Sequence, residues 1–300
     1  MRSGLACLAS AVRVEDRVDE FRPVCPPFPE TPDGDGYYLP VRDGEVLVRA
    51  TSSSVTLCQS WPKGIERPPG FTLIGWLGQR PCLMAELPPG RLPRMAGHAL
   101  RDLRSLHGLL TDGEFAAAGT ALAVLHFLHT SVFCPRCGKQ AERDPSCWLR
   151  RCPACGLEQE PRTHPTVMVL VHDRMQVLLT QPVGFSRDLF TLPAVVVGPG
   201  QGLEEALLHF VSQTLGVNIR GLTYFGSQPW PFPDRVVIGF HGRAEATRSV
   251  AFDRRHFVAA RWFHIDDLPA LPAPLSLARR MADWYAQLPR LQGYPTIPSS

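Results

Sequence analysis

The sequence predicts a multi-domain protein of mixed α+β and α/β class. Three observations support this class: 300 residues are too many for one small core, the first third alternates as β-strands do, and the last part mixes strand patterns with amphipathic helices. We expect a β-rich N-terminal domain over residues 1–95, a helical connector over 96–130, a cysteine-rich ribbon over 131–160, an α/β/α domain over 161–286 and a tail over 287–300.

The N-terminal elements follow from turn residues and hydrophobic patterning. Residues 1–35 are rich in Pro, Asp and Gly and predict an irregular lead-in. Two strands are expected around the Asp43-Gly44 turn, and another pair over 71–78 and 80–87. We then expect one helix over 97–109 and a second after the N-cap candidates Thr111 and Asp112. The second helix places four apolar residues on one face: Phe115, Ala118, Leu122 and Leu125.

The C-terminal part alternates between strands and helices. Strands are expected over 163–173, 175–181, 221–230 and 235–245, with a strand and turn over 256–271. Amphipathic helices are expected over 203–215 and 276–288, and the last dozen residues predict a loose tail.

Composition limits the class of function. The chain is 44% hydrophobic and 20% charged, and its net charge of +3 does not by itself argue for a nucleic-acid partner. No run of eighteen apolar residues occurs, so we expect no membrane-spanning helix, and the N-terminal stretch makes a poor signal peptide. We therefore expect a cytoplasmic protein. Scattered cysteines fit this compartment as free thiols: Cys7, Cys25, Cys58, Cys82 and Cys147.

The strongest motif is a pair of CxxC knuckles separated by fourteen residues. Its ligands are Cys134, Cys137, Cys152 and Cys155, and a glycine follows each knuckle. Four thiolates suit a tetrahedral Zn²⁺ and leave no position for water, so the motif predicts a structural zinc site. The segment also carries five basic residues, which leaves nucleic-acid binding open as a second role: Arg136, Lys139, Arg143, Arg150 and Arg151.

A family resemblance rests on this ribbon and on five further stretches. The ribbon, with Trp148 inside it, is followed by "HPTVMVLV", by a glycine-rich loop and helix, and by "SQPWPFP" at 227–233. Together with "ARWFHIDDLP" (260–269) and "LARR" (277–280), the chain from about residue 98 to 286 resembles the NAD(H) diphosphatase branch of the Nudix hydrolases. The N-terminal half resembles the family only in outline.

The resemblance implies a Nudix α/β/α sandwich, usually in a homodimer. Enzymes of that branch split the pyrophosphate of NADH or NAD⁺, and some remove NAD caps from RNA. The resemblance also implies that a substrate pocket is lined by Gln228, Trp230, Phe232 and Ala278. Aromatic residues that flank the nicotinamide in the family are replaced here by Glu160 and Val196.

The family's metal-binding box, G-x5-E-x7-R-E-U-x-E-E-x-G-U with U aliphatic, runs without gaps from Val195 to Val217. Only Val211, Gly216 and Val217 match. The departures are Val195 for the first glycine, Gln201 for the first glutamate, His209 and Phe210 for Arg-Glu, and Gln213 and Thr214 for Glu-Glu. A downstream glutamate of the family is also missing from the stretch His256 to Ala259. No catalytic position of the box is therefore intact.

The missing carboxylates lead to competing hypotheses. Positions 210, 213 and 214 share one helix face, where carboxylates would hold Mg²⁺ or Mn²⁺ beside the diphosphate. The favoured interpretation is an inactive or impaired homologue that keeps a pocket for NAD(H) or NAD-capped RNA. The alternatives are an active diphosphatase that uses Mg²⁺ or Mn²⁺, and a zinc-ribbon nucleic-acid-binding module. A new transition-metal site on His209 and His256 is also possible.

Overall fold

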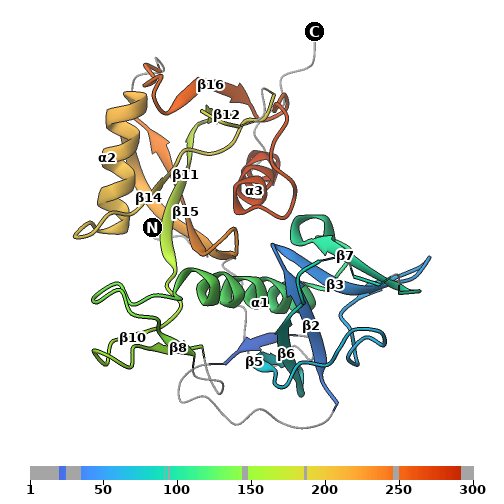
Figure 1. The fold of residues 1–300 in the computed structure, drawn as a ribbon. Helices are drawn as coiled ribbons and strands as arrows, with labels where there is room; N and C mark the ends of the chain where they lie inside the picture. Colours follow the sequence, from blue (N-terminus) through green and yellow to red (C-terminus); the bar gives the residue numbers. More distant parts are fainter. Residues whose placement is uncertain are drawn as a thin grey trace, which may run out of the picture. The chain divides into compact units, whose positions relative to one another are not determined.

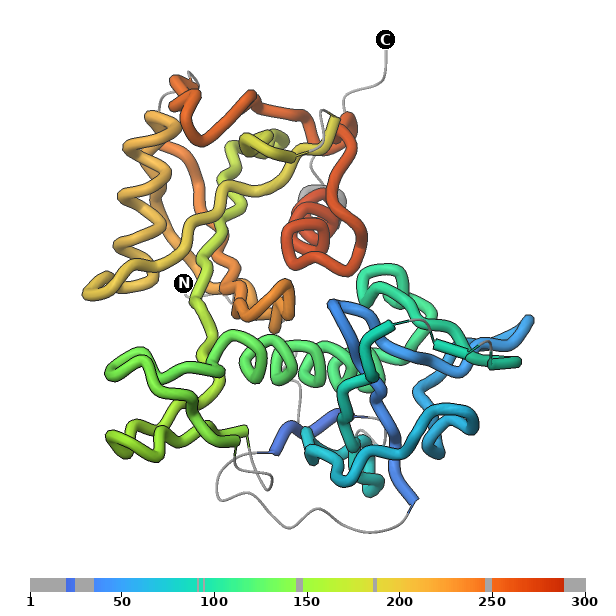
Figure 2. The backbone as a smooth tube through the Cα atoms, viewed as in Figure 1, coloured from blue at the N-terminus to red at the C-terminus, as the bar shows by residue number. Residues whose placement is uncertain are grey.

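The computed structural model describes residues 20–24, 35–90, 92–93, 95–143, 148–185, 188–245 and 250–291, with side chains up to 288. Two compact units follow one another along the chain, Met1–Pro161 and Arg162–Ser300 (Figures 1 and 2). Most of the predicted lead-in, the end of the predicted tail, and Cys7, Cys25 and Cys147 lie outside the described residues. In the part of the chain that is described, no helix is long and apolar enough to cross a membrane.

The first unit is built on a seven-stranded sheet of order β1-β5-β6-β2-β3-β4, with β7 also pairing β3. Its strands are β1 (Phe21–Pro23), β2 (Tyr37–Arg42), β3 (Glu45–Ala50), β4 (Val55–Thr56), β5 (Thr72–Leu77), β6 (Arg80–Glu86) and β7 (His98–Asp102). The predicted strand pairs are confirmed as β2–β3, which turns at Asp43 and Gly44 with positive φ, and β5–β6.

Two predictions for this unit are wrong. The segment predicted as a helix over 97–109 forms β7, which pairs with β3 along its whole length, and then the short 3-10 helix η1 (Leu103–Leu106). Pairing with β3 outweighs the local helical pattern. Without β7, the backbone N–H and C=O groups of β3 on the edge away from β2 would lack hydrogen-bond partners. The lead-in is not wholly irregular either, since β1 pairs with β5. Gly75 permits this pairing, because a Cβ there would lie 2.4 Å from Arg22 O.

The predicted helix after Thr111 is confirmed as α1 (Asp112–Thr130). The Thr111 hydroxyl accepts from Glu114 N, and Glu114 Oε2 accepts from Thr111 N, which together form a capping box. Glu114 is buried, and its other oxygen, Oε1, accepts from Leu57 N at 3.1 Å. This one carboxylate therefore joins the start of the helix to the sheet beneath it.

The cysteine-rich ribbon is a small antiparallel sheet of order β10-β9-β8. Its strands are β8 (Glu142–Arg143), β9 (Arg150–Arg151) and β10 (Glu158–Gln159). Within the same unit, Trp148 Nε1 donates to Leu73 O of β5 at 3.0 Å. The ribbon is therefore attached to the N-terminal sheet.

The second unit contains a six-stranded mixed sheet of order β14-β15-β11-β12-β16, with β13 pairing β11. Its strands are β11 (His164–Asp173), β12 (Gln176–Pro182), β13 (Ala194–Val196), β14 (Ile219–Trp230), β15 (Arg235–Ala244) and β16 (Phe257–His264). Its helices are α2 (Leu203–Leu215) and α3 (Leu277–Leu291). The predicted strands and helices of this part are confirmed.

The two helices cover opposite faces of this sheet (Figure 1). Val167 and Val169 of β11 pack in one core with Leu207 of α2, whereas Met168 of the same strand packs in a second core with Met281 of α3. Alternate residues of β11 therefore face different helices, as expected for a strand buried on both sides. Helix α3 lies close to β15 because residue 239 is glycine; a Cβ there would be 2.6 Å from Met281 Sδ.

Candidate functional site

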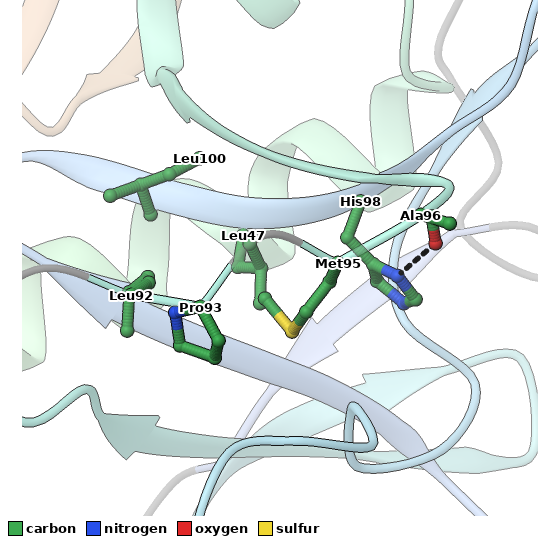
Figure 3. Close-up of a pocket in the computed structure, with 7 residues that line it drawn as sticks. All are labelled: Leu47, Leu92, Pro93, Met95, Ala96, His98 and Leu100. Atoms are coloured by element: carbon green, nitrogen blue, oxygen red, sulfur yellow. Dashed lines mark hydrogen bonds between the residues drawn. The ribbon is translucent and has the colours of Figure 1, made fainter.

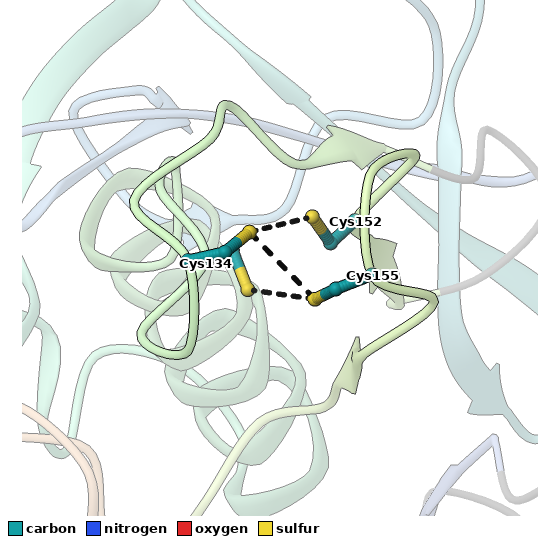
Figure 4. Close-up of side chains that lie close together, drawn as sticks. Cys134, Cys152 and Cys155 are labelled. Carbon is teal, nitrogen blue, oxygen red and sulfur yellow. Dashed lines mark hydrogen bonds between the residues drawn. The ribbon is translucent and has the colours of Figure 1, made fainter.

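The four cysteines of the two knuckles lie close together, and Figure 4 labels three of them, Cys134, Cys152 and Cys155. Their sulfur atoms all lie within 4.8 Å of one another. Cys134 and Cys155 are 3.5 Å apart, Cys137 and Cys152 are 3.5 Å apart, and Cys137 and Cys155 are 3.7 Å apart. A tetrahedron with Zn–S bonds of about 2.3 Å has edges of about 3.8 Å, so the donor set fits Zn²⁺.

Two thiols of the ribbon differ in pKa. Burial raises the pKa of Cys134, but the backbone N–H groups of Arg136 and Cys137 and the neighbouring thiols outweigh it and lower this pKa to about 7. By contrast, burial raises the pKa of the scattered thiols Cys58 and Cys82 to about 12. Within the cluster, the backbone N–H of Lys139 lowers the pKa of Cys137, but the neighbouring sulfur atoms and burial outweigh it and raise this pKa to about 12. The fit of the cluster to a structural zinc ion therefore rests on its four-sulfur geometry.

The basic residues of the ribbon are largely engaged within the first unit. Arg150 donates to Leu128 O at 2.7 Å and to Ala141 O at 3.0 Å. Arg143 donates to the hydroxyl of Thr72, and Arg151 forms an ion pair with Glu158. Of the five basic residues noted in the sequence, the remaining two, Arg136 and Lys139, are exposed. The ribbon therefore offers little uncommitted positive charge to a polynucleotide.

The three positions that the sequence alignment with the family's box assigns to metal ligands are Phe210, Gln213 and Thr214, and they lie on α2. Gln213 is exposed, Phe210 is half-buried, and Thr214 is 7% exposed. The Thr214 hydroxyl donates to Phe210 O at 2.6 Å, so its hydrogen is used within the helix. This face offers a ring, an amide and a hydroxyl, none of which carries negative charge.

Phe210 packs against residues at the start of β16. Its ring centroid lies 5.7 Å from that of His256 and 6.0 Å from that of Phe257, and both contacts are edge-to-face. His256 therefore faces the helix. Ala259, at the end of the 256–259 stretch, is buried in β16 and pairs with Gln181.

The remaining box positions lie apart from this contact. Gln201 is exposed in the loop before α2. Its Oε1 accepts a hydrogen bond from Gly198 N at 3.0 Å, within the same loop. His209 is exposed on α2. Apart from the four cysteines, no group of three or more His, Cys, Asp or Glu side chains among the described residues is placed to hold a metal ion. The possible pair of His209 and His256 therefore gains no third ligand there.

Sequence reasoning missed Asp253, which lies beside the end of α2. Its backbone N–H donates to Thr214 O at 2.8 Å. Hydrogen bonds from Arg255 to its carboxylate lower the pKa of Asp253 to about 2, so this group is ionised but already paired. The Asp-x-Arg spacing was the available signal in the sequence.

The residues suggested for the substrate pocket gather on the α3 side of the sheet. The rings of Trp230 and Phe232 meet edge-to-face at 5.0 Å, and Trp230 packs against the α3-side core. Ala278 is buried in that core. The side chain of Gln228 is bonded to backbone at the start of α3. Phe210 packs on the other face, so the structure brings the two predicted sets of residues to opposite sides of one sheet.

A separate pocket lies in the first unit (Figure 3). Its lining is mostly apolar and consists of Leu47, Leu92, Pro93, Met95, Ala96, His98 and Leu100. The Nδ1 atom of His98 lies 3.2 Å from Ala96 O, within hydrogen-bond distance. Among the described residues, the polar contribution to this lining comes from His98.

Comparison with known proteins agrees with both units. A family described as "NUDIX domain" matches residues 162–288, and one described as "NADH pyrophosphatase-like rudimentary NUDIX domain" matches residues 35–126. The N-terminal half therefore resembles the family in more than outline.

Similar proteins include NAD-capped RNA hydrolase NudC of Deinococcus radiodurans, which is 32% identical over 94% of this chain and 96% of its own length. The protein of the same name from Pseudomonas aeruginosa is 33% identical over 74% of this chain and 79% of its own. A solved NUDIX hydrolase from Nitrosomonas europaea is 16% identical, covers 55% of this chain and 95% of its own, and has a TM-score of 0.47.

The chain therefore belongs to the Nudix hydrolases, in the NAD(H) diphosphatase branch. The relatives that it matches over most of its length carry the name NAD-capped RNA hydrolase NudC.

Proposed function

We propose that this chain is a Nudix pseudoenzyme: it binds NAD(H) or an NAD-capped RNA end but has lost the metal site that cleaves the diphosphate. The observation that carries the proposal is the α2 face. Phe210, Gln213 and Thr214 replace three carboxylates, and Phe210 packs on His256 and Phe257, beside the stretch where the family has a further glutamate.

The loss matters because of what the metal ions contribute in a Nudix reaction. Mg²⁺ dehydrates reluctantly and is held through anionic oxygens, so a ring, an amide and a hydroxyl make poor replacements. A bound ion would screen the diphosphate charge and lower the pKa of the attacking water. Losing several kcal/mol of such stabilisation slows the reaction by more than ~10³-fold.

Retention of a nucleotide site is supported by a different set of residues. The motif that contains Gln228, Trp230 and Phe232 is present in full, and Ala278 lies on the neighbouring helix. The replacement of family aromatic residues by Glu160 and Val196 removes stacking partners, each worth roughly 1 kcal/mol, so the affinity should be weaker than in an aromatic-flanked site.

An active NAD(H) diphosphatase is the second candidate, and one observation favours it. A relative named NAD-capped RNA hydrolase aligns over 94% of this chain at 32% identity. Activity would require Mg²⁺ or Mn²⁺ to be bound through groups other than the three replaced positions. The zinc-ribbon nucleic-acid module is less favoured, because Arg143, Arg150 and Arg151 are engaged within the unit.

We also propose that the chain forms a homodimer, as expected for the family. We keep the division of the chain into the five segments predicted from the sequence. Sedimentation at several concentrations tests the dimer.

Equilibrium binding tests the function. The zinc-loaded protein should bind NADH with the same affinity in buffer with Mg²⁺ and in buffer without divalent ions. The reason is that positions 210, 213 and 214 have no carboxylate that could hold Mg²⁺ beside the diphosphate. The Deinococcus radiodurans relative serves as the reference in parallel titrations. Failure to bind NADH, NAD⁺ and NAD-capped RNA would remove the pocket from the proposal. Affinity that rises steeply with Mg²⁺ would favour the active alternative.

A further inference from the structure

Both polar atoms of the Gln228 side chain are engaged with the beginning of α3. Oε1 accepts a hydrogen bond from Leu277 N, and Nε2 donates one to Leu275 O, each at 2.7 Å. Leu275 and Leu277 are both buried. A side-chain amide can in principle make more bonds than these, but diverting either atom to a ligand would leave a buried backbone group without its partner.

These bonds complete the cap of α3. The first N–H groups of a helix have no partner within the helix. Ser276, which precedes the helix, accepts from Arg279 N through its hydroxyl at 3.2 Å and from Arg280 N through its carbonyl at 3.1 Å. Leu277 N is served from outside the helix, by Gln228 of β14. The first turn of α3 is thus held by its own N-cap and by a neighbouring strand.

Ala278 sits inside this doubly held turn. It is buried in the α3-side core, as is Met281 one turn further on, which packs close over Gly239 of β15. Gln228 itself is fixed in register, because it pairs with Val237 across β14 and β15. The position of Ala278 is therefore set by Gln228 through Leu277.

We propose that Gln228 is a positioning residue that fixes the first turn of α3, and with it Ala278. The functional part of this inference rests on the proposed nucleotide site at Ala278. The amide is specific to the role: asparagine is too short to reach, glutamate can accept from Leu277 N but cannot donate to Leu275 O, and leucine can do neither.

The test compares Gln228→Ala and Gln228→Glu with Thr223→Ala in the full-length protein. Thr223 is exposed on the same strand and lies outside the 227–233 motif, so its replacement is the matched control. Amide hydrogen exchange at Leu277, measured by NMR without ligand, reads the cap directly. Loss of one hydrogen bond of ordinary strength corresponds to about a five- to tenfold increase in exchange.

In Gln228→Ala we expect that increase at Leu277, together with weaker NADH binding. In Gln228→Glu we expect Leu277 to stay protected, because the acceptor remains, and much of the affinity to return. If Gln228→Ala does not fold, the Leu277 amide in Gln228→Glu still tests the cap. Slow exchange there supports the inference, and fast exchange contradicts it.

Two results would overturn the inference. One is weaker NADH binding in Gln228→Ala with unchanged exchange at Leu277, which would make Gln228 a direct ligand contact. The other is faster exchange at Leu277 in Gln228→Ala with unchanged NADH binding, which would separate the cap of α3 from the proposed nucleotide site. If the unmodified protein binds no NADH, the proposed function fails, whereas the exchange measurement still decides whether Gln228 holds α3.

Discussion

Replacing Phe210 by alanine tests whether its ring has become part of the core at the position where the family has a metal ligand. Phe210 is half-buried, packs against the α2-side core and meets the rings of His256 and Phe257 edge-to-face. A buried Phe→Ala change costs about 3–5 kcal/mol, so we expect about 2 kcal/mol for a half-buried ring with two such contacts.

Differential scanning calorimetry of the full chain measures this cost. For a unit of this size, 2 kcal/mol corresponds to a decrease of about 4–8 °C in the Tm of the C-terminal transition. Leu208→Ala is the matched control, because Leu208 lies on the same helix but is exposed. If Phe210→Ala lowers the Tm no more than Leu208→Ala does, the ring does not pack as described and the site has not been filled by it.

Three further outcomes are expected. The double substitution Phe210→Glu and Gln213→Glu places two carboxylates on one helix face, so Mn²⁺ should bind this variant and raise its Tm. At a hundredfold excess of Mn²⁺ over Kd, the free energy of unfolding should rise by about 2.7 kcal/mol, whereas the Tm of the unmodified protein should not change. Cys134→Ser should purify without its zinc and with a lower Tm of the N-terminal unit, because metal binding there is coupled to folding; elemental analysis that finds no zinc in the reduced unmodified protein would contradict this. Stability should fall as the pH drops from about 6.5 towards 4: burial and the neighbouring His241 lower the pKa of His172 to about 4 in the folded chain, whereas the unfolded chain takes up this proton near pH 6.5. His172→Gln should lessen the decrease of the urea midpoint over that range, and an equal decrease in both proteins would refute the assignment.

The C-terminal fold could be predicted because its patterns are strong and local. The continuous apolar run of β11 and the amphipathic face of α2 each match one type of element. The segment 97–109 could not, because its fate depends on β3, which lies about fifty residues earlier in the chain. The strand β1 depends on Gly75 in the same way, through a close approach that no local pattern reveals.

The candidate site divides along similar lines. The zinc ligands could be predicted, because the spacing of two CxxC pairs is itself the geometric information. The identities of Phe210, Gln213 and Thr214 could also be read from the sequence, but the burial of Thr214 and the edge-to-face contact of Phe210 with His256 could not. For Gln228, the sequence gives membership of a motif, whereas only the fold shows that its amide is bonded to the start of α3.

Hydrolysis of NADH in the presence of added Mg²⁺ or Mn²⁺ tests the central claim most directly. Zinc-loaded protein would be incubated with NADH, and NMNH and AMP would be separated and quantified, with the Deinococcus radiodurans relative assayed in parallel. Because positions 210, 213 and 214 offer no carboxylate, we expect a rate more than ~10³-fold below that of an enzyme with an intact metal site, and no dependence on either ion. Release of NMNH and AMP that rises with Mg²⁺ or Mn²⁺ would contradict the account and establish the chain as an active diphosphatase.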